Sequence, residues 1–197
     1  MAKLTFTRFK CDVDTNEWGS ESPYFLTWVG NVQTNTSALK YTRKAFWENK
    51  VDPGPWWPVN DTVVANFDLS PDHTLALTLM IEEDEGVDLT FAEATDNNAN
   101  NALKSVRETM AALLNVHNQN GSNIQAANVV SNFRLTLAGA AKKFLQNANG
   151  ASDDLMESAP GNAAKVIQLQ HAPAVLTQVT YRDDGDGKYL AEFTVSA

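Results

Sequence analysis

The chain is poor in cysteine, in positive charge and in long apolar runs, and each shortage excludes a class of protein. Cys11 is the only cysteine among 197 residues, which excludes an intrachain disulfide and a cysteine-rich zinc site. Fifteen basic residues face 24 acidic ones, and the net charge of -9 opposes unassisted binding to nucleic acid or to an anionic membrane. No apolar run approaches the ~20 residues of a membrane helix, and residues 1–10 lack the continuous apolar core of a signal peptide. We therefore expect a soluble protein with no nucleic-acid partner.

Recognisable catalytic patterns are also missing. His73, His117 and His171 lie in unrelated segments, without the i,i+4 spacing that places two histidines on one helix face. No phosphate-binding loop, dinucleotide fingerprint or Gly-x-Ser-x-Gly motif is present. The sequence favours a protein that is not an enzyme.

Alternating apolar residues predict about eight β-strands. The predicted strands cover residues 4–9, 24–29, 38–51, 62–69, 74–81, 165–170, 175–182 and 188–195. Residues 70–73 form a tight polar connection, typical of a hairpin or an arch, and the Asp-Gly pairs of residues 183–187 favour a hairpin turn. Strands interrupted only once by helices indicate a mainly β fold, an antiparallel sandwich, because a parallel sheet needs regularly alternating helices.

The interruption has helical periodicity. A first helix begins near Ala99 and a second follows the stop at residues 118–121. The first apolar stripe contains Leu103, Val106, Met110, Leu113, Leu114 and His117; the second contains Ile124, Ala127, Val130, Phe133, Leu137, Ala141, Phe144 and Leu145. We expect one domain, residues 1–197, with an αα-hairpin inserted at residues 90–150. Its apolar faces can meet each other and also lie against the sandwich.

Two acidic segments flank this insertion and carry a family resemblance. Residues 20–25 (Ser-Glu-Ser-Pro-Tyr-Phe) resemble the Ser-Asp-Pro-Tyr-Val segment that starts the second strand of C2 domains. Residues 82–88 resemble the start of the third top loop of that family, and residues 153–157 (Asp-Asp-Leu-Met-Glu) resemble its Asp-Asp-Leu-Ile-Gly ending. The helical hairpin then looks like an insertion in that loop. The resemblance covers residues 1–88 and 151–197, with Ser22 standing where the family has an aspartate.

The resemblance implies a calcium site, because the top loops of C2 domains bind Ca²⁺ through aspartates and often dock on membranes or proteins without catalysis. The implied metal ligands are Asp12 and Asp14, with Glu17 or Glu21, facing Glu83, Glu85, Asp88 and Asp153. We call this group of carboxylates the acidic tip. Clustered carboxylates repel one another unless a cation joins them, and hard oxygen ligands suit Ca²⁺. The alternative is that these carboxylates form a solvated, solubilising rim.

Trp56 and Trp57 stand between prolines and suggest a contact surface for a sugar or a protein partner, since rigid aromatic rings give contact area at low entropy cost. The alternative places one ring in the core and the other over a loop, because neighbours on a strand face opposite ways.

We interpret the chain as a non-catalytic binding or assembly module whose partner is another protein or a second copy of the chain. Its binding would depend on calcium if the acidic tip holds the ion. Two alternatives stay open: a membrane-active component whose hairpin opens, and a carbohydrate-binding module.

Overall fold

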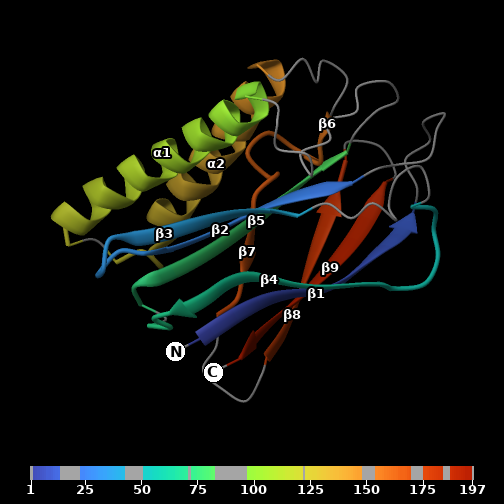
Figure 1. Cartoon of the computed structure of the whole chain (residues 1–197), viewed down its shortest axis with the longest axis horizontal. Helices are drawn as coiled ribbons and strands as arrows, with labels where there is room; N and C mark the ends of the chain where they lie inside the picture. Colours follow the sequence, from blue (N-terminus) through green and yellow to red (C-terminus); the bar gives the residue numbers. More distant parts are fainter. Residues whose placement is uncertain are drawn as a thin grey trace.

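The computed structural model describes residues 2–13, 23–42, 51–70, 72–82, 97–121, 123–147, 154–169, 175–183 and 187–196. Within these ranges the chain forms nine strands and two helices (Figure 1). In chain order the elements are β1 (Ala2–Val13), β2 (Tyr24–Asn31), β3 (Thr36–Thr42), β4 (Trp57–Phe67), β5 (Thr74–Glu82), α1 (Asn97–Gln119), α2 (Ala127–Asn147), β6 (Asp154–Leu155), β7 (Lys165–Ile167), β8 (Val175–Arg182) and β9 (Lys188–Ser196). The protein is therefore mainly β, as the alternating pattern predicts.

The strands form two antiparallel sheets. Sheet A has the order β4-β1-β9-β8, and sheet B has the order β3-β2-β5-β6, with β7 also paired to β5. The connection at residues 68–73 links β4 of sheet A to β5 of sheet B, so it is the arch and not the hairpin. The predicted hairpin between residues 175–182 and 188–195 is confirmed, with Val175 opposite Val195.

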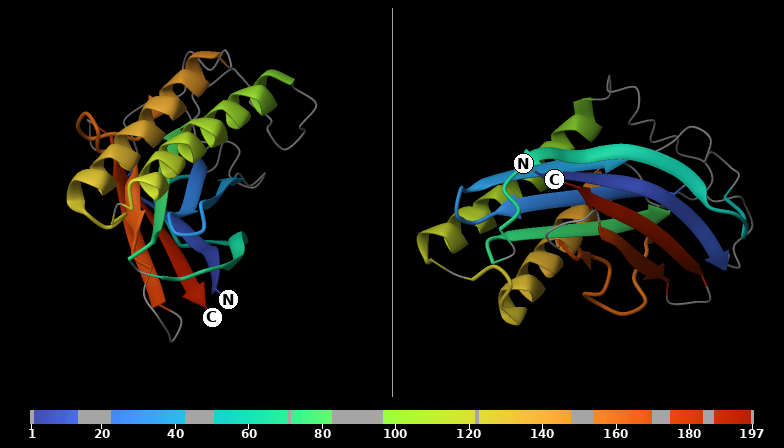
Figure 2. Two further views of the ribbon diagram at one scale, coloured as in Figure 1. Left: turned by 90° about the vertical axis from the view of Figure 1, so that its left-hand side faces the viewer. Right: turned by 90° about the horizontal axis from the view of Figure 1, so that it is seen from below.

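The molecule has three layers, because both helices lie on the outer face of sheet B (Figures 1 and 2). The core between the sheets contains Phe6, Phe9, Phe25, Tyr181 and Phe193, all fully buried. A second core joins sheet B to the helices. It includes Leu26, Trp28, Leu75, Leu77, Leu79 and Ile81 from the strands and Met110, Leu114, Phe133, Leu137 and Phe144 from the helices.

Strand β5 is buried on both faces, which the alternating pattern does not anticipate. Leu75, Leu77, Leu79 and Ile81 belong to the core under the helices, whereas Ala76 and Met80 belong to the core between the sheets. The period-two alternation of Leu75, Leu77, Leu79 and Ile81 predicts that this row points into the sandwich, and that prediction is wrong. The reason is that a continuous apolar strand has two faces to cover, and the inserted helices cover one of them.

The helices agree with the predicted stripes apart from the start of the second one. Ala127 is exposed and Val129 is buried in its place, because Ile124 precedes α2 in a turn. Arg134 ties α2 to the connection between β6 and β7, donating from Nε to the carbonyl of Ala164 over 2.6 Å. Within the described ranges, neither helix is apolar and long enough to cross a membrane.

Candidate ligand-binding cleft

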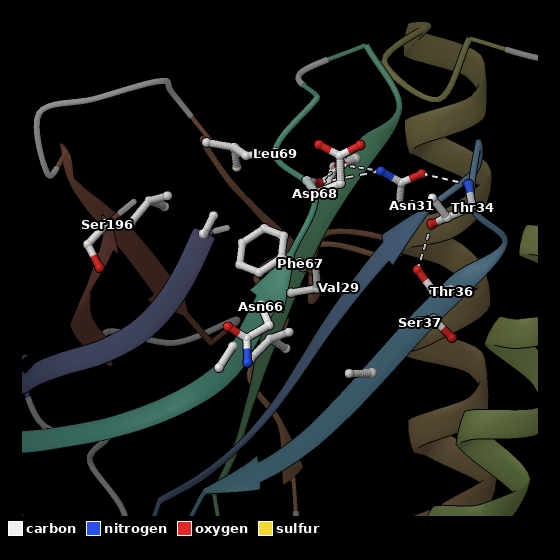
Figure 3. Close-up of a pocket in the computed structure, with 16 residues that line it drawn as sticks. Val29, Asn31, Thr34, Thr36, Ser37, Asn66, Phe67, Asp68, Leu69 and Ser196 are labelled. Carbon is white, nitrogen blue, oxygen red and sulfur yellow. Dashed lines mark hydrogen bonds between the residues drawn. The ribbon is translucent and has the colours of Figure 1, made fainter.

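A cleft of about 650 Å³ opens between the two sheets along the side where β3 and β4 are the outermost strands. Its floor is apolar and includes Val29, Val64 and Leu69. Its rim carries hydroxyl and amide side chains, among them Ser37 and Asn66 (Figure 3). A concave apolar surface with a few polar groups is the usual composition of a ligand site.

A bulge in β4 shapes the cleft. Ala2 pairs with Phe67 and Lys3 pairs with Ala65, so Asn66 is an extra residue on its strand. The backbone of Asn66 has a φ of 59°, in the left-handed region that asparagine tolerates better than most residues. A bulge bends its strand and redirects the side chains around it. Figure 3 accordingly shows the ring of Phe67 in the cleft, with Asn66 and Asp68 on opposite sides of it.

Buried hydrogen bonds hold one wall of the cleft in place, at the connection between β4 and β5. Asn31, which is 3% exposed, donates from Nδ2 to Thr74 Oγ1 over 2.9 Å and accepts from the backbone N–H of Thr34, also over 2.9 Å. Thr74 Oγ1 in turn donates to the carbonyl of Asp68 over 2.7 Å. This network fixes the arch between the sheets relative to the turn after β2, and so it positions Asp68.

The groups that a ligand can reach include the exposed side chains of Asn66 and Asp68. Neither forms a hydrogen bond or ion pair with another described residue. Asp68 is the one charged residue among the described residues that line the cleft. An amide offers both a donor and an acceptor, and a carboxylate accepts only, so the pair suits a ligand with N–H, O–H or cationic groups.

Comparisons with known proteins add no family to this picture. No protein-family model, curated protein or solved structure matches the chain.

The acidic tip lies almost entirely outside the described residues. Seven of its predicted ligands do so: Asp14, Glu17, Glu21, Glu83, Glu85, Asp88 and Asp153. The eighth, Asp12, lies near the end of β1, where Lys188 and Lys10 both donate to its carboxylate, the latter over 2.9 Å. These bonds lower the pKa of Asp12 to about 2. Among the described residues no three His, Cys, Asp or Glu side chains gather as a metal site would require, and the calcium prediction stays a prediction.

The paired tryptophans take different roles. Trp57 is partly buried and packs against the core between the sheets. Trp56 is half-buried, and the guanidinium of Arg8 lies over its ring, 4.4 Å from the centroid. Arg8 also pairs with the buried carboxylate of Glu192 on β9. One face of Trp56 is therefore covered by a cation–π contact, and its use as a contact surface stays a prediction.

Sequence reasoning missed the cleft. It placed Asn66 and Asp68 inside an ordinary strand, residues 62–69. A signal was present, because asparagine and aspartate are depleted in strands and asparagine is common at left-handed positions. The packing of one sheet on the other creates the cavity, and no local sequence pattern predicts that packing.

Proposed function

We propose that this protein is a non-catalytic binding module whose ligand occupies the cleft between β3 and β4. The observation that carries the proposal is the pair of unbonded side chains, Asn66 and Asp68, which the bulge in β4 places beside the ring of Phe67 (Figure 3). Retaining an irregular strand at a cavity mouth is typical of a site that aims side chains at a ligand.

The binding role fits the chemistry of the lining. Its described members bear amides, hydroxyls, apolar groups and one carboxylate, which can orient a ligand but supply no nucleophile paired with a base. The buried support from Asn31 and Thr74 keeps the wall fixed before a ligand arrives. A pre-formed site loses less conformational entropy on binding.

A C2-like identity for the sandwich belongs to the same proposal. Its support is that described residues of all three segments carrying the resemblance lie at one end of sheet B. Tyr24, which follows the Ser-Pro pair, lies opposite Ile81, and Asp154 lies opposite Glu82. The acidic segments thus begin or end at the same edge, and we propose that they bind calcium there.

The cleft is tested by nuclear magnetic resonance titration with short peptides and neutral oligosaccharides. We expect at least one of these classes to shift the backbone amides of residues 66–69, and Asn66→Gly to weaken that binding tenfold or more. Glycine keeps the left-handed backbone while removing the amide. Asn60→Gly is the matched control, since Asn60 is also an exposed, left-handed asparagine on β4 but does not line the cleft. Equal binding by the two variants, or no shift with either class, contradicts the proposal.

A further inference from the structure

The edge of β3 that faces away from β2 is more regular than the edge of β4, which lies across the cleft. All seven residues of β3 pair in unbroken register with β2, from Thr36 opposite Asn31 to Thr42 opposite Phe25. No described strand pairs with its other side. Across the cleft, β4 contains Pro58 and three register shifts against β1, features that obstruct pairing with another strand. Of these two edges, β3 is the one that can accept a further strand.

Two hollows flank β3 at the same point. The first is the cleft on the sandwich side, and the second is a hollow of about 450 Å³ between β3 and α1. Ser37 and Ala38 line both. Leu39 and Tyr41 pack into the core under the helices, so Ser37, two residues before Leu39, faces the helix side by strand alternation, and Ala38 faces the cleft. Small residues at this point leave space on both faces of the sheet edge.

This arrangement matches the period of a strand. A segment pairing with β3 would direct successive side chains to opposite faces of sheet B, one into the cleft and the next into the hollow beside α1. Main-chain hydrogen bonds would supply affinity, and the two hollows would select side chains. We propose that β3 is a docking edge for an extended segment of a partner protein, with basic side chains entering the cleft and apolar side chains entering the hollow beside α1.

The residue types in the two hollows set this alternation. In the cleft the unbonded carboxylate of Asp68 attracts a cation, and the whole chain carries a net charge of -9. In the hollow beside α1 the indole of Trp28, the side chain of Leu39 and the methyl group of Ala111 offer apolar contact. Arg107 and Glu108 carry opposite charges at that hollow and favour neither sign. The partner segment should therefore alternate basic and apolar residues.

The inference rests on the proposed function, since the cleft supplies one of the two hollows. Its probe is the peptide acetyl-Thr-Val-Lys-Val-Lys-Val-Thr-amide, with affinity measured by calorimetry at several salt concentrations. Ala111→Phe fills the hollow beside α1 and should weaken binding at least tenfold. Ala112→Phe is its matched control, because Ala112 is a neighbour that is also exposed and does not line the hollow. Asp68→Asn should also weaken binding, whereas Asp72→Asn, exposed on the same connection but outside the cleft, should not.

Strand pairing is separated from side-chain binding by two methylated peptides. In one the three valines are N-methylated, and in the other the two lysines are. Alternate residues of a strand point their N–H groups to the same neighbour, so one peptide should lose binding and the other should retain it. Equal binding by both, with Ala111→Phe harmless, overturns strand docking but leaves a side-chain site in the cleft. Absence of any peptide binding overturns the inference too, while the oligosaccharide titration still tests the cleft. Concentration-dependent self-association abolished by Ala111→Phe would instead assign the edge to a second copy of the chain.

Discussion

The indole ring of Trp28 lies over the backbone of Gly30, two residues along the same strand. A Cβ atom on Gly30 would overlap the Cζ2 and Cη2 atoms of that ring and lie 3.2 Å from Cε2. Trp28 is 1% exposed and stacks on Phe133 of α2, with ring centroids 5.3 Å apart. The glycine therefore lets a strand of sheet B hold the largest side chain of the core under the helices.

Gly30→Ala should lower the free energy of unfolding by about 1–3 kcal/mol, because the added methyl group forces the ring away from Phe133. Gly139→Ala provides the contrast, since a Cβ at that helical position meets nothing within 4 Å. Alanine there should stabilise the protein by about 0.5–1 kcal/mol. Urea unfolding of both variants checks the prediction, and a neutral Gly30→Ala variant would contradict it.

Tyr181→Phe should destabilise the protein by about 0.5–1.5 kcal/mol. The fully buried hydroxyl of Tyr181 on sheet A donates to Thr78 Oγ1 on sheet B over 2.9 Å. Tyr189→Phe is a matched control, because the hydroxyl of Tyr189 is also buried but has no hydrogen-bond partner among the described residues. Its removal should cost nothing or stabilise. Thermal melts in which both variants behave alike would rule out the hydrogen bond between sheets as a source of stability.

The contacts of Lys10 and Lys188 with the carboxylate of Asp12 should make the free energy of unfolding depend on pH under acidic conditions. Lys188 and Lys10 lower the pKa of this carboxyl from 3.8 to about 2 in the folded protein. Because the folded state holds the proton less tightly, the contribution of Asp12 is present above the unfolded pKa and is lost as pH falls from about 4 to 2. Asp12→Asn should flatten the melting temperature across this range. A profile identical to the parent would show that the ion pairs do not act in solution.

Calcium should raise the melting temperature if the acidic tip holds the ion. An ion that binds only the native state stabilises it by RT ln(1 + [L]/Kd), ~2.7 kcal/mol at a hundredfold excess over Kd. Magnesium should have a smaller effect, because it prefers rigid octahedral geometry and retains its waters. The double variant Asp14→Asn, Glu83→Gln should lose the response. A melting temperature indifferent to calcium leaves the solvated-rim interpretation in place.

The inserted helices should be required for solubility. Loop-closure entropy changes by only ~0.6 kcal/mol per doubling of loop length, so a short linker in place of residues 90–150 costs little by itself. Deletion nevertheless exposes Leu75, Leu77, Leu79 and Ile81 on sheet B to solvent. Apolar area loses ~25 cal/mol of stabilisation per Å² when it is exposed to water, and an exposed apolar surface of this kind promotes aggregation. We expect the deletion variant to aggregate. Size-exclusion chromatography that shows a soluble, cooperatively melting monomer would contradict this.

The sequence predicts this fold to the level of its strands and helices but not of their partners. Period-two alternation located most strands, and period three to four located both helices. The apolar run of β5 is compatible with either neighbour, so only the tertiary structure shows that Leu77 faces the helices and Ala76 faces sheet A. The cleft depends on strands far apart in the chain, with Asn66 close to Asn31 only after the sheets pack. The local sequence pattern does not predict how the two sheets pack.

The pairing of β1 with β9 makes Cys11 a reporter of the closure of sheet A. Cys11 lies opposite Tyr189 and is fully buried, although 178 positions separate the two residues in the chain. β1 therefore lacks one of its two neighbours until β9 has been synthesised and has docked. A thiol reagent applied in short pulses during refolding would modify Cys11 only before that event. The decay of labelling would then time the closure of sheet A on a natural probe, without any engineered label.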